Sequence, residues 1–230
     1  MKKTKKSNIM KKEEKQQILN ELGSEGVKIL PWIGDNYEDG LKISSDGKID
    51  YNNYNHKKLL ILNPSFYGDT KENTKIMAYG VINEDVEGCL PSFRRFENAI
   101  LGKEHTKEDI ENFWNHVAFY TYRQENNSAI VLKSDSLKDN AYKEYFDKVV
   151  DKLSPDYIIC WGTILMETIR SSHKKVKDPF VYYIEDSSYE IEEIVIGKRP
   201  VLFLGLYHPS SMHFSIQENR EALITAFKYR

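Results

Sequence analysis

Short apolar runs alternate with amphipathic segments over most of the chain. Four runs have the length and composition of buried strands and cover residues 58–62, 116–122, 157–161 and 201–207. Segments with a helical spacing of apolar residues lie between and after them, at residues 92–101, 106–113, 139–153, 162–171 and 215–229. This alternation is typical of a mostly parallel sheet with helices on both faces. The pattern therefore predicts an α/β fold, a three-layer α/β/α sandwich around a short, mostly parallel four-stranded sheet.

The chain before the first of these runs has a different pattern. The spacing of apolar residues at 9–22 predicts an amphipathic helix. Residues 41–51 alternate between apolar and polar on either side of Asp46-Gly47, which strongly predicts a hairpin. We expect residues 1–56 to form a helix and hairpin extension that packs on a domain of residues 57–230. The lysine-rich start of the chain predicts either a solvated tail or an arm that touches DNA.

Composition narrows the class of protein. With 230 residues, 40% of them hydrophobic and 30% charged, and no apolar run near about 18 residues, we expect a globular protein without a membrane span. Only Cys89 and Cys160 are present, too few for a disulfide framework or a four-cysteine zinc site, so we expect neither a metal nor a cofactor. The lysine-rich start lacks the features of a secretory signal, which predicts a cytoplasmic protein. The net charge of -2 does not by itself indicate a nucleic-acid partner.

Candidate chemistry lies directly after the predicted strands, because ligands of such sheets bind outside the carboxyl ends of the strands. The loops concerned are residues 63–68, 121–127, 161–163 and 208–213. His208 follows the last strand, and Pro209 stiffens the loop behind it. His208 and His213 do not have the spacing of zinc ligands on a helix. Taken alone, His208 also fits a structural histidine, and the loop that begins at residue 63 also fits an ordinary Asn-Pro turn.

Two loops carry motifs that change the interpretation when they are taken together. The first strand ends in Asn63-Pro64-Ser65, and the last is followed by His208-Pro209-Ser210-Ser211-Met212. These resemble the first catalytic motif, in its Asn-Pro form, and the last motif of the uracil-DNA glycosylase superfamily. Residues 92–96 and 155–162 resemble two further segments of that superfamily in the same order. The resemblance extends from about residue 57 to the C-terminus.

The resemblance implies a monofunctional DNA glycosylase that flips a nucleotide out of DNA and hydrolyses its N-glycosidic bond. His208 matches the residue that donates a hydrogen bond to the departing pyrimidine, and Asn63 the residue that positions the attacking water. Met212 matches the wedge that fills the vacated stack, and Ser210 and Ser211 match residues that contact phosphates. DNA is then the expected partner, and no obligate protein partner is implied.

Two positions depart from the uracil-specific members and concern the base pocket. Ser65 stands where those members have a tyrosine that excludes a C5-methyl group, and Thr121 stands where they have an asparagine that reads the uracil edge. Phe66 and Phe93 compete for the role of stacking on the base, and each also fits an ordinary core position. Asn115 is a second candidate for base recognition, although a structural cap fits it better. We therefore expect uracil or a C5-modified pyrimidine as the substrate.

Three other functions also fit the sequence. One is a variant of the first, in which the target is a modified base in phage DNA and the role is antiviral defence. A second is a non-catalytic nucleic-acid or nucleotide-binding module on the same fold. A hydrolase of small metabolites ranks last, because the chain lacks a G-x-S-x-G motif.

Overall fold

A single large sheet organises the chain. The computed structural model describes residues 12–51, 56–65, 82, 90–125, 134–185 and 187–229. Within them an eight-stranded sheet has the order β1-β5-β4-β6-β10-β9-β7, and β8 pairs with β9. The strands in this order are β1 (Trp32–Ile33), β5 (Val117–Thr121), β4 (Leu59–Asn63), β6 (Tyr157–Trp161), β10 (Arg199–Leu206), β9 (Ser187–Ile196) and β7 (Lys174–Lys175), with β8 at Phe180–Ile184.

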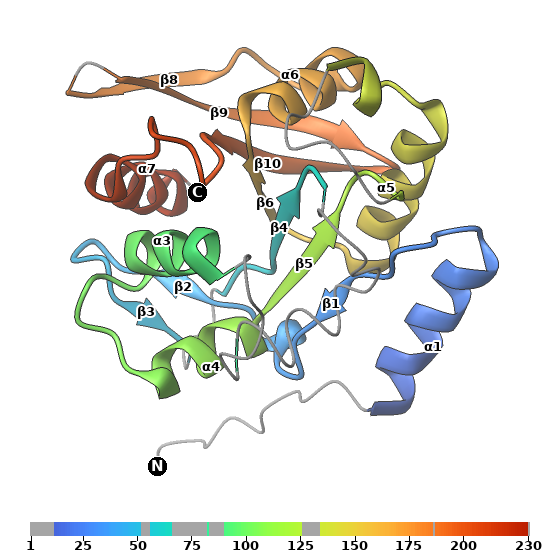
Figure 1. Ribbon diagram of the computed structural model, residues 1–230, viewed down its shortest axis with the longest axis horizontal. Coiled ribbons are helices and arrows are strands. Elements are labelled where there is room, and N and C mark those ends of the chain that lie inside the picture. Colours follow the sequence, from blue (N-terminus) through green and yellow to red (C-terminus); the bar gives the residue numbers. More distant parts are fainter. Residues whose placement is uncertain are drawn as a thin grey trace.

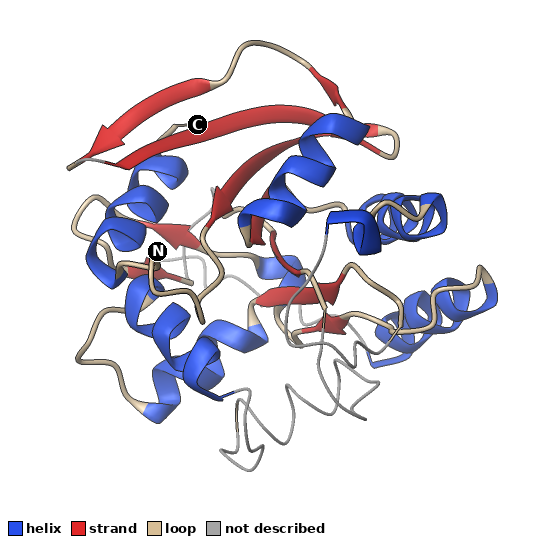
Figure 2. Cartoon of the chain, turned by 45° about the horizontal axis from the view of Figure 1, so that its top comes forward, coloured by secondary structure: helices blue, strands red, loops and turns tan. Residues whose placement is uncertain are grey.

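The four predicted strands form the centre of this sheet. Strands β5, β4, β6 and β10 are mutually parallel, which confirms the expected parallel core. The expected number of four strands is wrong, because antiparallel strands extend both edges. Strand β1 pairs with β5 on one side, and β9, β7 and β8 continue the sheet beyond β10. Figure 2 shows the long antiparallel strands curving along one edge of the molecule.

Helices cover both faces of the sheet. All six predicted helices are present: α1 (Lys12–Ser24), α3 (Leu90–Ile100), α4 (Lys107–Asn115), α5 (Asn140–Leu153), α6 (Thr163–Ser172) and α7 (Ile216–Lys228). Helices α3, α4 and α7 lie on one side of the sheet, and α1, α5 and α6 lie on the other (Figure 1). The described residues thus form an α/β fold compatible with a three-layer sandwich.

The central strands are apolar throughout because both of their faces are covered. In β4, Leu59 and Ile61 belong to the core beneath α3, α4 and α7, whereas Leu60 and Leu62 belong to the core beneath α1, α5 and α6. Side chains alternate across a strand, so a strand buried on both faces reads as a continuous apolar run. This is why these strands could be recognised in the sequence.

The N-terminal residues are built into the sheet as well as packed on it. The predicted hairpin is confirmed, with β2 (Lys42–Ile43) antiparallel to β3 (Ile49–Asp50) and Gly47 at a φ of 78° in its turn. The short strand β1 adds a further connection, because it pairs with β5. Residues 12–51 therefore supply an edge strand to the same sheet that carries the candidate loops.

Candidate active site

The order of the parallel strands determines where a cleft opens. The chain passes from β4 to β5 on one side and then crosses to β6 on the other side of β4. Such a switch in direction leaves a crevice at the carboxyl ends of the two strands between which it occurs, here β4 and β6. A cavity of about 220 Å³ lies there, and its wall includes Pro64, Ser65, His208, Ser210 and Ser211.

The first and last motifs meet at Gly162, the residue that precedes helix α6. A Cβ atom built on Gly162 would lie 3.8 Å from Cβ of His208 and 4.0 Å from Cγ of Pro64. Gly162 has a φ of 97°, a conformation that side chains rarely adopt, and its N–H donates to the carbonyl of Leu206 at 2.8 Å. A Cβ atom at these distances would be in ordinary contact, so it is the backbone conformation that favours glycine where the loops after β4, β6 and β10 meet around one cavity.

The hydrogen bonds of His208 determine which ring nitrogen carries the proton. The backbone N–H of Ser210 donates to Nδ1 at 3.1 Å, and the Ser210 hydroxyl lies 2.7 Å from the same atom. Since an N–H group can only donate, Nδ1 is unprotonated and the neutral ring carries its hydrogen on Nε2. Burial lowers the pKa of His208 from 6.5 to about 4. At neutral pH, His208 is therefore an uncharged hydrogen-bond donor through Nε2.

Asn63 is held at the end of β4 with a defined orientation. Its Nδ2 donates to the carbonyl of Ser65 at 3.0 Å, and no described residue donates to its Oδ1. The backbone is fixed from β5, because Tyr122 donates to the carbonyl of Asn63 at 2.9 Å. The strand register pairs Asn63 with Thr121, and both side chains are buried. Both residues lie at the strand ends that bound the cleft, but neither is on the cavity wall formed by the described residues.

The residues expected to contact the base have different positions. Ser65 lines the cavity, and its buried hydroxyl has no hydrogen-bond partner among the described residues. Phe66 lies outside the described residues. Phe93 is not on the cavity wall: it is buried in the core, with its ring centroid 5.4 Å from that of Trp161. Trp161 in turn contacts His208 edge-on at 6.0 Å. The apolar face of α3 turns this ring toward the sheet, so the position of Phe93 fits the alternative of a core residue better than a stacking role.

The loop after β10 presents its tip to solvent. Ser210 is exposed, Ser211 is partly exposed, and Met212 is 88% exposed. The loop is held from behind by Arg95 of α3, whose Nη1 donates to the carbonyl of Ser211 at 2.9 Å and whose Nη2 donates to that of Phe214 at 2.6 Å. This role of Arg95 has no sequence signal, because its partners are main-chain carbonyls more than a hundred positions away.

Comparison with known proteins does not identify a family for this chain. The chain matches no protein-family model, and no curated protein matches it. Among the described residues, no helix is both long and apolar enough to cross a membrane. The same part of the chain contains no group of three histidine, cysteine or acidic side chains placed to hold a metal ion. The geometry of the cleft is therefore the main indication of what this protein does.

Proposed function

We propose that this protein is a monofunctional DNA glycosylase with a uracil-DNA glycosylase-like fold, which hydrolyses the N-glycosidic bond of uracil or a C5-modified pyrimidine after base flipping. One observation carries the proposal. His208, a neutral donor, and the loop anchored by Asn63 bound one cavity at the switch point of the sheet, although 145 positions separate the two residues in the chain. A cavity of about 220 Å³ suits a single heterocyclic ring better than the larger ligands that fill pockets of about 300–1,000 Å³.

The proposed reaction needs a hydrogen-bond donor at the departing base. Cleavage breaks the bond between C1′ of the sugar and N1 of the pyrimidine, and the electron pair leaves with the base. Negative charge then collects on the base oxygens, where the Nε2–H of His208 donates. A preorganised donor at such a position lowers a barrier by about 3 kcal/mol. A protonated imidazole is not required, which agrees with the lowered pKa of His208.

Asn63 would act on the water that forms the new bond to C1′. The hydrogen bond from its Nδ2 to the carbonyl of Ser65 fixes the side chain, and its Oδ1, the only acceptor of the amide, would accept a hydrogen bond from that water. An amide cannot take the proton, so the proton passes to solvent or to the released base. We therefore expect slow hydrolysis, since general-base catalysis typically contributes about 10²- to 10⁴-fold.

The exposed loop supports DNA as the substrate. Flipping a nucleotide leaves a gap in the base stack, and an exposed, flexible apolar side chain such as Met212 suits that gap. Ser210 and Ser211 flank the cavity. The Ser211 hydroxyl accepts from the backbone N–H of His213 and keeps its own hydrogen for a phosphate oxygen, whereas the Ser210 hydroxyl donates to Nδ1 of His208. Ser65 adds little bulk to the cavity wall, which favours a substituent at C5 of the base. A modified base in phage DNA would be such a substrate, and the protein would then act in antiviral defence in the cytoplasm.

A panel of DNA substrates tests the proposal. Duplex and single-stranded oligonucleotides containing uracil, mismatched thymine, hydroxymethylcytosine or glucosylated hydroxymethylcytosine are incubated with the protein, and abasic sites are detected by alkaline cleavage. We expect an abasic site with at least one base and no strand break before alkali. Binding across the panel without any abasic product would instead favour a non-catalytic nucleic-acid-binding module. Neither binding nor product would contradict both functions.

A further inference from the structure

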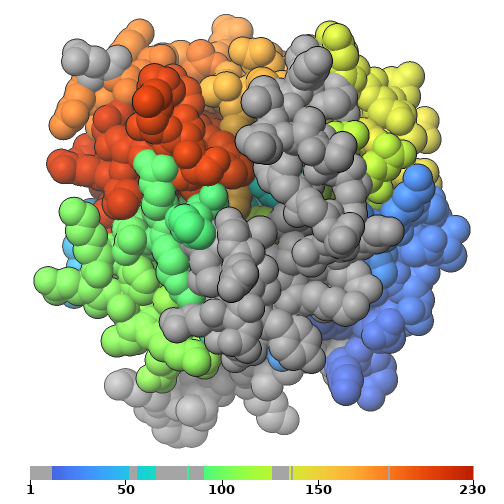
Figure 3. Space-filling model, viewed as in Figure 1, coloured from blue at the N-terminus to red at the C-terminus, as the bar shows by residue number. Residues whose placement is uncertain are grey.

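A second hollow lies beside the proposed active site, between helices α3 and α7. It has a volume of about 460 Å³, and its wall includes Arg95, Lys103, Gln217 and Arg220. In Figure 3 the red surface of the C-terminal residues lies directly against the green surface around α3, where this groove is formed. We call it the α3–α7 groove. The proposed chemistry does not use it.

The α3–α7 groove carries positive charge without a matching carboxylate. Arg95, Lys103 and Arg220 line it, and none of the described residues on its wall is acidic. Within the part of the chain that the structure describes, none of these three cations forms an ion pair. The nearby carboxylate of Glu97 is buried and is bound instead by Arg94 and Trp114. In a protein with a net charge of -2, this is a local excess of positive charge.

The hydrogen bonds of the two arginines preserve that charge. Arg95 donates to the carbonyls of Ser211 and Phe214, and Arg220 donates to the carbonyl of Gly47 at 2.9 Å and to two carbonyls at the end of α3. A carbonyl satisfies an N–H group but does not neutralise a guanidinium, which has five N–H donors in total. Both side chains are therefore held in place, and their positive charges remain available to an anion.

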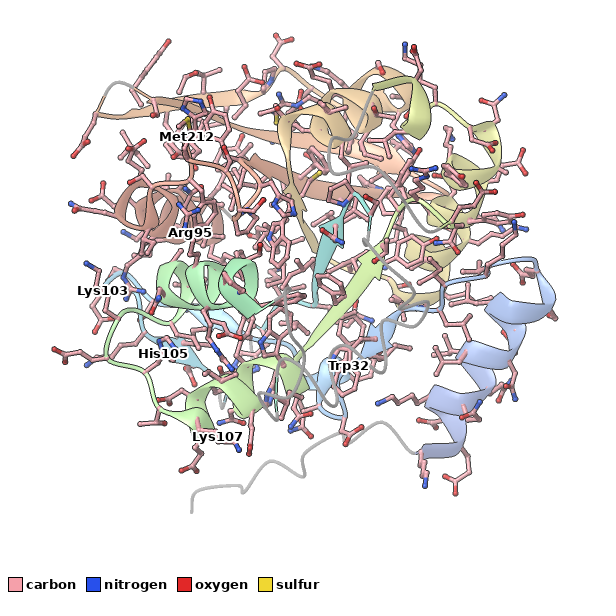
Figure 4. All side chains as sticks on the ribbon, in the orientation of Figure 1. Trp32, Arg95, Lys103, His105, Lys107 and Met212 are labelled. Carbon is pink, nitrogen blue, oxygen red and sulfur yellow. The ribbon has the colours of Figure 1, made fainter. Side chains whose placement is uncertain are left out.

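The position of the α3–α7 groove also fits a DNA strand that has one nucleotide in the cleft. Arg95 connects the two regions directly, because it binds the carbonyls on either side of the exposed tip at Met212. In Figure 4, Arg95 lies below Met212 in the left half of the view, and Lys103 lies lower still and nearer the left edge. A strand with a nucleotide in the cavity and Met212 in its stack would continue toward this edge.

We propose that the α3–α7 groove binds a phosphodiester of the DNA backbone next to the flipped nucleotide. This inference depends on the proposed function for the identity of the partner, and it adds a backbone contact outside the predicted loop motifs. Fixed guanidinium groups suit phosphate because they present paired N–H donors. The contact would position the DNA without reading its sequence.

The test measures the binding of fluorescently labelled, unmodified DNA duplex by anisotropy over a range of salt concentrations. Lys103→Glu is the informative variant, because Lys103 is exposed and its loss leaves no buried group unpaired. Lys198→Glu is the matched control, since Lys198 is also exposed but lies in the turn before β10, at the opposite end of that strand from His208. We expect Lys103→Glu to weaken binding several-fold and to reduce the slope of log K against log salt by about 0.9. Lys198→Glu should change neither.

The outcomes separate this inference from the proposed function. Equal affinities and salt slopes for wild type and Lys103→Glu would overturn the groove as a backbone site, even if abasic product forms. A weakened Lys103→Glu variant of a protein that makes no abasic product would support the groove and contradict the glycosylase. Inorganic phosphate, added at constant ionic strength, should not displace the duplex. Displacement by low millimolar phosphate would assign the groove to a free anion and overturn the proposal.

Discussion

The neutral state of His208 gives a prediction about stability as well as catalysis. In the unfolded chain its imidazole should titrate near the ordinary value of 6.5, whereas in the folded protein burial lowers the pKa to about 4. Above pH 6.5 both states are neutral and the residue contributes nothing to pH dependence. As the pH falls from 6.5 to 4, only the unfolded state takes up the proton, so stability is lost in that window.

The size of this loss follows from the two pKa values. The full difference between 6.5 and about 4 corresponds to at most about 3 kcal/mol, and the loss accumulated by pH 5 is about 2 kcal/mol. Partial exposure of the ring to solvent makes these values upper limits. His208→Gln removes the titrating group and should therefore lose less stability than wild type on acidification.

Urea unfolding of both proteins at pH 7.5, 6 and 5 measures the effect. The free energy of unfolding of wild type should fall relative to that of His208→Gln, by up to about 2 kcal/mol at pH 5. His116, whose pKa burial also lowers, is present in both proteins and cancels in the comparison. Parallel pH dependences of the two proteins, or an NMR titration of His208 near 6.5, would refute the reasoning.

Three further substitutions test the surroundings of the site by urea unfolding. Gln124→Ala should cost about 2–3 kcal/mol, because the side chain of Gln124 accepts from the buried N–H of Ile29 and donates to the carbonyl of Thr121; an effect below about 0.5 kcal/mol would contradict this. Glu97→Gln should cost about 1–3 kcal/mol through the lost ion pair with Arg94, and unchanged stability would show that the pair is unimportant. Gly162→Ala should cost about 1–2 kcal/mol because its φ is 97°, and a stabilised variant would be inconsistent with that conformation.

The sequence predicted the central part of the fold because the signals there are local. A strand buried on both faces is apolar at every position, and Leu59–Asn63 shows this pattern apart from its last residue. The helices have apolar stripes, and several begin at a recognisable cap, such as Thr106 before α4. The convergence of His208 with the Asn63 loop followed from strand order, which places the carboxyl ends of parallel strands together.

The antiparallel edge could not be predicted in the same way. Strand β9 contains Glu190, Glu192 and Glu193, which make the segment appear solvated, yet Glu192 is fully buried. Its charge is compensated by Arg170 of α6 and Lys175 of β7. Neither partner is a neighbour in sequence, so the buried position of this carboxylate depends on tertiary structure. The contacts of Arg95 with the loop after β10 were not predicted for the same reason, because its partners are also distant in sequence.

Single-turnover excision by matched variants tests the central claim most directly. With enzyme in excess over a substrate identified from the panel, the rate of base release is compared for wild type, His208→Ala, Asn63→Ala and His213→Ala. His213 lies in the same exposed loop but does not line the cavity, so its variant serves as the control. We predict that wild type releases the intact base, that loss of the donor at His208 slows release by about 10²- to 10³-fold, that Asn63→Ala is also slow, and that His213→Ala stays close to wild type. Undiminished release by both His208→Ala and Asn63→Ala would contradict the account.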